Sequence, residues 1–440
     1  MTEPQISVGI MSAPEINFSL FNSYHCENKK LDKGDYSTKI VNGKIDFDGN
    51  LHAEVLLQAE DIHNSSFELK DVVIGVNFHW ERKKNQQFQG HLKLIVENDM
   101  ITAINIVSLE DYLMSVISSE MSATSSEELL KAHAVISRSW LLAQIEKNKT
   151  LVTSKDGYET SFETGSEIVR WWDREDHINF DVCADDHCQR YQGITKQSTP
   201  LVADVVKETY GQIMMFNDAI CDTRFSKCCG GFMETFENVW EPTPHPYLFG
   251  KADSKNISFV TPNLTNEYEA VDWIKSSPAA FCNTKDSNVL KQVLNDYDQE
   301  TSDFYRWTVT YSQEELSQLI LKRSGIDYGD ILELIPIERG TSGRIIRLKI
   351  IGTNQVMTIG KELEIRRTLS ESHLYSSAFV VETSEEDDEG IPGKFTLHGA
   401  GWGHGVGLCQ IGAAMMADKG FTYKEILAHY YPNAGIEKKY

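Results

Sequence analysis

The first hundred residues constrain the fold most strongly, because they contain only short segments of strand character. Between residues 5 and 106 these segments alternate apolar and polar residues or are rich in β-branched residues, and Gly, Asn and Asp separate them. A half-buried strand has a side-chain period of two, and the separating residues are typical of tight turns. We therefore expect the N-terminal part to form several strands, in an antiparallel sheet or an open barrel.

The first helical pattern, at residues 107–144, contains an acid in an unusual place. Ser108 is the predicted N-cap, and apolar residues follow at i, i+3 and i+4 spacing. This apolar stripe consists of Leu109, Leu113, Val116 and Ile117. Glu120 extends the stripe at the C-terminal end of the helix, where burial and the helix dipole would both raise the pKa of its carboxyl, as a general acid requires. The alternative is that Glu120 is the exposed end of a fraying helix.

A second helix is predicted directly afterwards, with Ser125 and Glu128 as a capping box. Lys131 and Arg138 are seven residues apart and therefore share one face of this helix. The two cations are expected to face the same cleft as Glu120. The alternative is that they belong to a solvated face.

Histidine and cysteine residues between 177 and 188 have the chemistry of a metal site. His177, Cys183 and Cys188 would supply three zinc ligands and leave a fourth position for water, substrate or another side chain. A disulfide between the two cysteines, or free thiols, would also fit this spacing. Further along, Cys221 and the adjacent Cys228 and Cys229 are interpreted as structural pairs or buried thiols rather than nucleophiles.

The segment from His398 to Gly420 has glycine at every second position between Gly399 and Gly407. Glycines before a helix suggest phosphate binding, but no GK[ST] motif and no βαβ unit accompany them, so nucleotide binding is rejected. Trp402, His404 and Gln410 provide an aromatic platform and two hydrogen-bonding groups, which suit a sugar ring. A packing turn with a core tryptophan is the alternative.

Charge and hydropathy exclude several classes of partner. The formal net charge of −23 over 440 residues argues against binding to nucleic acid or to an anionic membrane surface. No apolar run approaches the roughly 18 residues needed to span a membrane, and the first residues do not have the pattern of a secretory signal. A cytosolic protein, or one whose leader is not part of this sequence, is therefore expected.

Several motifs together resemble one family of bacterial cell-wall proteins, the stage II sporulation protein D and LytB amidase-enhancer family (SpoIID/LytB). The motifs occur in the order of the family between about residues 90 and 436. They are LEDYLMSVISSEM, KAHAVISRSW, CQRYQG, GRIIRLKI, the run from Leu363 to Val381, GWGHGVGLCQIGAAMMADKG and YKEILAHYYPNAGI.

This resemblance implies a lytic transglycosylase that cuts peptidoglycan glycan strands already stripped of stem peptides. Glu120 matches the acid/base of the family, and Lys131 and Arg138 match further polar positions of its site. His177, Cys183 and Cys188 match zinc ligands, which implies a structural or site-organising zinc ion. The LytB branch enhances an amidase, so a non-catalytic glycan-binding module with a cell-wall amidase as partner is the alternative. A peptidoglycan substrate would place the protein in the cell envelope, periplasmic or extracellular.

The sequence also departs from the pattern of the family. His133 stands where Gln is usual, Cys409 where Ser is usual, and residues 226–231, SKCCGG, replace a run like STSGG. The additional cysteines suggest either disulfides of a subgroup or an altered metal site.

These observations predict a strand-rich, two-lobed α+β protein with a few helices and a glycan cleft. Four consecutive regions are expected: a β-rich region at 1–90, a catalytic core with the zinc cluster at 91–250, an inserted α/β region at 251–345 and the glycine-rich part at 346–440. Within the insertion, NEYEAVDWI and SNVLKQVLNDY are predicted helices. A strand and a helix should follow in RWTVTYSQEELSQLILKRSG, and DILELIPIERG should pair with GRIIRLKIIGT as a hairpin.

Overall fold

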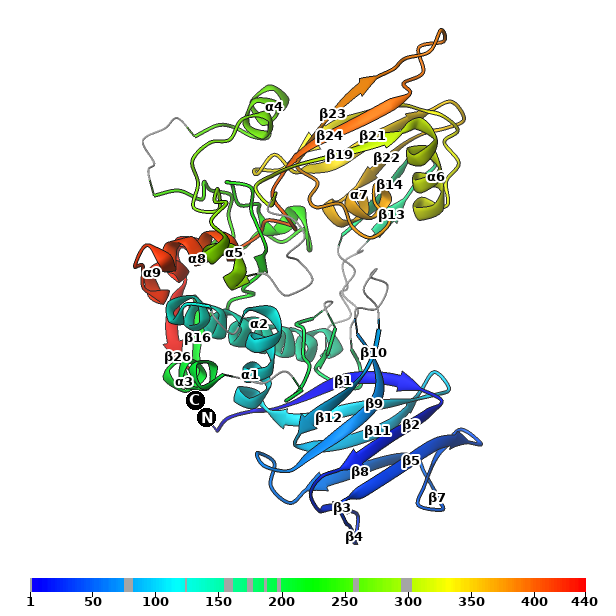
Figure 1. The fold of residues 1–440 in the computed structure, drawn as a ribbon, viewed down its shortest axis with the longest axis vertical. Helices are drawn as coiled ribbons and strands as arrows, with labels where there is room; N and C mark the ends of the chain where they lie inside the picture. The colour runs from blue at the N-terminus through cyan, green and yellow to red at the C-terminus, as the bar shows by residue number, and fades with distance from the viewer. Residues whose placement is uncertain are drawn as a thin grey trace. The chain divides into compact units, whose positions relative to one another are not determined.

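A computed structural model describes residues 2–74, 82–122, 125–153, 161–171, 177–185, 188–195, 199–255, 261–293 and 303–440. The chain divides into two units, and each unit contains segments that are distant in the sequence (Figure 1). Unit 1 comprises Met1–Thr150, Asp176–Asp222 and Ile436–Tyr440, and unit 2 comprises Leu151–Glu175 and Thr223–Gly435. The sequence analysis divided the chain into consecutive regions, whereas both units are discontinuous. The α+β class is confirmed, because helices and mainly antiparallel sheets occur together.

Two open sheets in unit 1 account for the β-rich N-terminal pattern. Their orders are β15-β1-β12-β11-β8-β3-β4 and β10-β9-β2-β5-β6-β7, and neither closes into a barrel within the described residues. The strands are β1 (Gln5–Ala13), β2 (Glu15–Leu20), β3 (Tyr24–Cys26), β4 (Lys29–Leu31), β5 (Gly34–Val41), β6 (Lys44–Phe47), β7 (Asn50–His52), β8 (Glu54–Ala59), β9 (Ser66–Ile74), β10 (Arg82–Gln89), β11 (His91–Glu97), β12 (Met100–Ser108) and β15 (Val182–Cys183). Alternate residues of these strands are buried in one core, as in Glu15–Leu20, where Ile16 and Phe18 are 1% exposed.

Helices and a small sheet complete unit 1. The helices are α1 (Leu109–Glu120), α2 (Glu127–Thr153) and α3 (Pro200–Glu208), and the sheet contains β16 (Gln212–Phe216), β17 (Ala219–Ile220) and β26 (Gly435–Lys438). The chain passes directly from β12 into α1 at Ser108. Because β26 pairs beside β16, the end of the chain returns to the unit in which the chain starts (Figure 1).

The described residues of unit 2 form three further sheets. Their orders are β13-β14-β22-β21-β20, β19-β24-β23 and β18-β25. The strands are β13 (Ser161–Glu163), β14 (Glu167–Arg170), β18 (Phe225–Ser226), β19 (Arg306–Ser312), β20 (Ile331–Arg339), β21 (Ile345–Gly352), β22 (Val356–Gly360), β23 (Phe379–Ser384), β24 (Lys394–Ala400) and β25 (Leu408–Cys409). The predicted hairpin is confirmed, because β20 pairs with β21 antiparallel.

In unit 2, the predicted helical segments contain α4 (Glu267–Lys275), α5 (Ser287–Val293) and α6 (Gln313–Ser324), and α8 (Gln410–Asp418) follows the glycine run. The structure also has helices that the sequence did not predict, the 3₁₀ helix η1 (Phe236–Asn238), α7 (Glu362–Thr368) and α9 (Tyr423–Tyr430). A separate apolar core packs β19 to β24 against α6 and α7. Among the described helices, none combines the length and the apolar character that a membrane crossing needs.

Candidate functional site

Helix α1 places Glu120 at its last position. Its N-terminus forms as predicted, because the Ser108 hydroxyl accepts a hydrogen bond from the Asp111 N–H. The four residues of the predicted apolar stripe are fully buried. Glu120 itself is partly exposed, and its Oε1 accepts a hydrogen bond of 2.9 Å from the backbone N–H of Arg190. The carboxylate is therefore held in a defined position at the end of the helix. Its predicted raised pKa stays a prediction.

The segment that holds Glu120 is fixed to α1 by neighbouring residues. The backbone N–H of Gln192 donates to the hydroxyl of Ser115 on α1 at 3.2 Å. Tyr191 stacks on Tyr112 of α1 with ring centroids 5.0 Å apart, and its hydroxyl donates to Asn105 at 2.6 Å. These residues belong to the CQRYQG motif. The motif therefore acts as a support that aligns a backbone donor with the Glu120 carboxylate.

The three predicted zinc ligands lie together at the start of this segment. One donor atom from each of His177, Cys183 and Cys188 lies within 4.8 Å of the other two. The Cys188 Sγ is 3.5 Å from the Nε2 of His177, and it accepts the Cys183 N–H at 3.4 Å. All three are partly exposed and both cysteines are free thiols. Two thiolates and one imidazole that converge in this way fit zinc and leave a position open for a further ligand.

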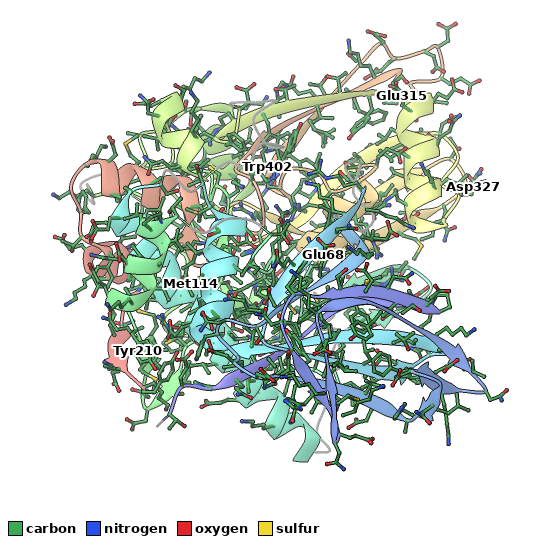
Figure 2. All side chains as sticks on the ribbon, turned by 60° about the horizontal axis from the view of Figure 1, so that its bottom comes forward. Glu68, Met114, Tyr210, Glu315, Asp327 and Trp402 are labelled. Atoms are coloured by element: carbon green, nitrogen blue, oxygen red, sulfur yellow. The ribbon has the colours of Figure 1, made fainter. Side chains whose placement is uncertain are left out.

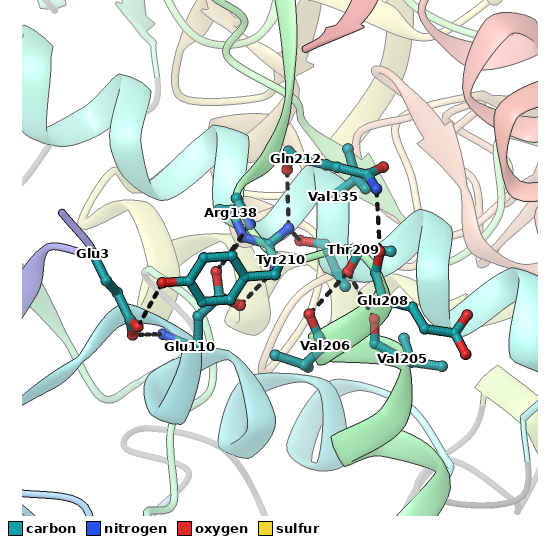
Figure 3. A network of polar contacts seen from close by, with 12 residues as sticks. Glu3, Glu110, Val135, Arg138, Val205, Val206, Glu208, Thr209, Tyr210 and Gln212 are labelled. Atoms are coloured by element: carbon teal, nitrogen blue, oxygen red, sulfur yellow. Dashed lines mark hydrogen bonds and ion pairs between the residues drawn. The ribbon is translucent and has the colours of Figure 1, made fainter. Parts of the chain in front are cut away.

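Lys131 and Arg138 do share one face of α2, and that face is directed at the Glu208–Gln212 segment. Figure 3 shows the contact of Arg138 with Gln212. Arg138 is fully buried and forms a bidentate pair with Glu110, with Nε to Oε1 at 3.0 Å and Nη2 to Oε2 at 2.7 Å. Its Nη1 donates to the Gln212 carbonyl at 2.9 Å. These contacts are all with the protein, so they support the fold of unit 1. The predicted contact of Arg138 with substrate stays untested.

Lys131 pairs with acids instead of lying unpaired at a cleft. Its Nζ is 2.6 Å from a Glu208 carboxylate oxygen and 2.5 Å from one of Glu127. Burial would lower the pKa of Lys131, but the hydrogen bonds that it donates to these two carboxylates raise it well above its usual range. Lys131 is therefore a permanent cation that connects α2 with α3. Helix α2 begins at Glu127, so Ser125 precedes the N-cap position, and its hydroxyl donates to the Ser122 carbonyl.

In unit 2, the alternating glycines of the 399–407 run allow a left-handed backbone conformation and a close approach to neighbouring backbone. Gly401, Gly403, Gly405 and Gly407 have φ between 72° and 90°, which L residues rarely adopt. A Cβ on Gly407 would lie 2.0 Å from the Arg224 carbonyl oxygen. The loop thus packs tightly against its own protein, which explains the glycines without a phosphate ligand and agrees with the rejection of nucleotide binding.

Trp402, labelled in Figure 2, is partly exposed and belongs to an aromatic cluster. Its ring centroid lies 4.4 Å from that of Tyr375 and 4.7 Å from that of Phe304. Trp402 therefore packs in a cluster of rings, and its predicted role as a sugar platform stays a prediction.

The other two predicted sugar-binding residues differ in exposure. Gln410 is 3% exposed at the first position of α8. His404 is partly exposed, and its Nδ1 accepts the Val406 N–H at 3.0 Å. Burial lowers the pKa of His404 well below its usual range, and the guanidinium groups of Arg224 and Arg344 lower it further. His404 is therefore neutral at pH 7 with its proton on Nε2.

The structure groups the predicted site residues into two sets. Glu120 and the His177, Cys183 and Cys188 set belong to unit 1, whereas Trp402, His404 and Gln410 belong to unit 2. Sequence reasoning missed the roles of Arg190 and Tyr191, although both lie in a motif that it recognised.

Comparison with known proteins agrees with the motifs. Residues 97–216 match the stage II sporulation protein family, and residues 234–407 match a domain family of unknown function. The stage II sporulation protein D of Bacillus subtilis (strain 168) is 25% identical over 338 residues, which cover 76% of this chain and 76% of the relative. The amidase enhancer of the same organism is 26% identical over 334 residues, which cover 74% of this chain and 40% of the relative. The predicted SpoIID/LytB resemblance is confirmed.

A third relative is an uncharacterised protein of Brachyspira hyodysenteriae (strain ATCC 49526 / WA1). It is 27% identical over 350 residues, which cover 80% of this chain and 72% of the relative. The chain therefore spans less than half of the amidase enhancer but about three quarters of the other two relatives. Glu120, the three predicted zinc ligands and both helices α1 and α2 lie inside the residues matched by the sporulation family.

Proposed function

We propose that the protein is a lytic transglycosylase that cleaves peptide-stripped peptidoglycan glycan strands in the cell envelope, with Glu120 as its single acid and base. The observation that carries the proposal is the position of this carboxylate. It lies at the end of a buried helix, is partly exposed, and is oriented by the Arg190 N–H. An acid fixed in this way at the edge of a core is suited to proton transfer.

One carboxylate is sufficient for this reaction. Glu120 gives its proton to the glycosidic oxygen as the bond from that oxygen to C1 of the muramic acid breaks. The C6 hydroxyl of the same sugar then attacks C1, and its proton passes to the Glu120 carboxylate. The products are a free hydroxyl on the leaving sugar and a 1,6-anhydro ring, and no water is consumed. A hydrolase would instead require a second carboxylate to activate water or to act as nucleophile.

A zinc ion on His177, Cys183 and Cys188 would organise this site. When bound, it would supply a rigid cross-link between three residues of the segment that leads to Arg190. Cys188 is only two residues before Arg190, so movement at this cysteine would be transmitted to the donor that orients Glu120. The role assigned to these three residues is therefore positioning.

Unit 2 is proposed to contribute sugar contacts. The partly exposed Trp402 offers a stacking surface for a sugar ring. Lys131 and Arg138 are assigned to the support of α2, because their side chains form ion pairs with Glu208, Glu127 and Glu110.

The decisive experiment is incubation of the Glu120→Gln variant with peptide-free glycan strands. The amide keeps a carbonyl oxygen that can accept the Arg190 N–H but cannot transfer a proton, so product formation should fall by at least about a hundredfold. Products of the parent protein should carry anhydro ends and take no label from ¹⁸O water. Glu54→Gln, an exposed acid on β8, is the matched control and should retain full activity. Normal turnover by Glu120→Gln would refute the assignment.

The amidase-enhancer relative favours a second candidate function, a glycan-binding module that activates a cell-wall amidase. Under this alternative the chain would bind glycan strands or stimulate an amidase, and Glu120→Gln would change neither effect. Stimulation of a purified cell-wall amidase by both the parent protein and the variant, with no anhydro product from either, would establish the second function.

A further inference from the structure

Four segments of unit 2 converge on a second set of metal-binding side chains, separate from the His177, Cys183 and Cys188 set. Cys229, Asp253, Cys282 and Cys409 each offer one donor atom, and these four atoms lie within 4.8 Å of one another. All four residues are buried, with exposed fractions between 0% and 2%. The corresponding segments are the SKCCGG turn, the loop at Asp253, the turn before α5, and the start of α8.

The distances suit a tetrahedral ion better than a disulfide. Ligand sulfurs on a tetrahedral zinc ion lie roughly 3.8 Å apart, given zinc-to-sulfur bonds of about 2.3 Å. The Sγ atoms of Cys229 and Cys282 are 3.5 Å apart, and the Cys229 Sγ is 3.6 Å from Oδ2 of Asp253. A disulfide would require about 2.0 Å between sulfurs, and all the cysteines are free thiols.

The surroundings of Asp253 resemble the outer shell of a metal site. Its Oδ1 accepts the Tyr430 hydroxyl at 2.9 Å and lies 3.3 Å from Nε2 of His429. Its Oδ2 accepts the Cys282 N–H at 3.1 Å and faces the thiols. Metal-binding carboxylates are typically held by such hydrogen bonds on the side away from the ion. The protein therefore orients the remaining lone pair of Oδ2 toward the thiols.

Cys409 has the environment of a thiolate ligand. It occupies the N-cap of α8, where the helix dipole favours negative charge, and its Sγ accepts the Cys229 N–H at 3.2 Å. Cys229 and Cys282 are buried in the same cluster. A bound cation would favour the thiolate form of all three.

We propose that unit 2 binds a structural Zn²⁺ ion through the thiolates of Cys229, Cys282 and Cys409 and the carboxylate of Asp253. The site is closed, because four protein ligands fill a tetrahedral shell and all of them are buried. The ion would connect the glycine-rich loop to the SKCCGG turn and to the loop between α4 and α5. It would also account for two departures from the family pattern, because Cys229 and Cys409 replace residues that are usually serine or threonine. The proposal is independent of the transglycosylase assignment.

Zinc content of the full chain, purified under reducing conditions, tests the proposal through variants. Cys183→Ser/Cys188→Ser should retain one zinc per chain, because it leaves the unit 2 site intact. Adding Cys282→Ser or Asp253→Asn to that background should reduce the zinc content to below about one tenth. Cys221→Ser is the matched control, because this thiol is also buried but belongs to neither set, and it should leave the content unchanged. Unchanged zinc in both Cys282→Ser and Cys409→Ser would overturn the proposal.

A measurement on the unaltered sequence remains decisive if these variants fail to fold. The protein is alkylated with and without a strong chelator, and the labelled cysteines are identified by mass spectrometry of peptides. Cys229, Cys282 and Cys409 should become reactive together, in step with release of one zinc equivalent. Alkylation of these three thiols at the same rate with and without chelator, or recovery of a Cys229 to Cys282 disulfide, would contradict the proposal.

Discussion

The guanidinium of Arg138 on α2 and the carboxylate of Glu110 on α1 form a buried bidentate pair, with Nη2 and Oε2 2.7 Å apart. Glu110 also accepts the Tyr440 hydroxyl at 2.5 Å, and its N–H donates to Glu3 at 3.0 Å (Figure 3). This one ion pair therefore connects α1 and α2 with residues from both ends of the chain. Removal of the Arg138 guanidinium would leave the buried Glu110 carboxylate without its cation.

Arg138→Met should lower the free energy of unfolding by about 3–5 kcal/mol, because the uncompensated Glu110 charge stays buried. Lys131→Met on the same helix face is the matched control. Its partners Glu127 and Glu208 are more than half exposed, so the loss should be within about 1 kcal/mol. Equilibrium denaturation followed by circular dichroism measures both. Equal losses of unfolding free energy in the two variants would contradict the distinction between a buried and an exposed ion pair. A raised KM in Lys131→Met at unchanged stability would restore the substrate role of Lys131.

Removal of the proposed zinc ligands of unit 1 should affect activity more than folding. Cys183→Ser/Cys188→Ser should lose one zinc equivalent and at least about tenfold in transglycosylase activity, because the ion positions the segment that orients Glu120. Circular dichroism should show retained secondary structure, since Tyr191 and Gln192 still hold the segment to α1. Cys26→Ser, a buried thiol in the same unit, controls for general loss of a cysteine. Full activity in a double variant that has lost this one zinc equivalent would exclude a positioning role.

His373 should make unit 2 less stable in acid. Burial lowers its pKa from 6.5 to about 4, and the cations of Arg366, Arg323 and Arg367 add to this effect. Between these two values the unfolded chain binds a proton at this position and the folded protein does not. The stability that the neutral His373 side chain contributes is therefore fully present above pH 6.5. It falls as the pH drops and is lost near pH 4.

The pH dependence of Tm tests this expectation. His373→Gln should flatten the decrease in Tm between pH 6.5 and pH 4, with an effect of the order of 1–3 kcal/mol at the acid end. His63→Gln provides a control of opposite sign, because a hydrogen bond to Asp111 raises the pKa of His63. The stability that His63 contributes is present below its ordinary pKa and is lost as the pH rises. If Tm of His373→Gln falls between pH 6.5 and pH 4 as steeply as Tm of the parent protein, His373 is not the source of the acid sensitivity.

Local chemistry explains which parts of the fold the sequence predicted. The Ser108 cap and the buried stripe of α1 depend on residues within one or two helical turns, and the β20 to β21 hairpin depends on neighbouring runs of period two. The shared face of Lys131 and Arg138 was also correct, since helix geometry alone determines it.

The partners of those residues were not predictable, because they are distant in the sequence. Gln212 lies 74 positions after Arg138, and Cys282 lies 53 positions after Cys229. No periodic pattern connects such pairs, and only tertiary packing brings them together. The same limit applies to Glu120, since its motif gave the residue but not the backbone donor that orients it.

The glycine-rich loop offers a comparison of two positions with the same backbone conformation. Gly407 and Gly420 have φ of 72° and 83°, but only at Gly407 would a Cβ meet backbone, 2.0 Å from the Arg224 carbonyl oxygen. Around Gly420 a Cβ would find no heavy atom within 4 Å. Alanine at either position should lower the free energy of unfolding by about 1–2 kcal/mol through the left-handed conformation. Gly407→Ala should lose roughly 1–3 kcal/mol more, because the backbone of β18 or β25 must shift.

Thermal denaturation of the two variants separates packing from conformation. A larger drop in Tm for Gly407→Ala would show that this glycine is required by contact with the Arg224 backbone, and the shift should extend to Cys409, two residues later. Zinc release from the unit 2 site should then occur at a lower chelator concentration in Gly407→Ala than in Gly420→Ala. Equal drops in Tm would mean that the loop does not pack against Arg224, and the alternating glycines would need a ligand to explain them.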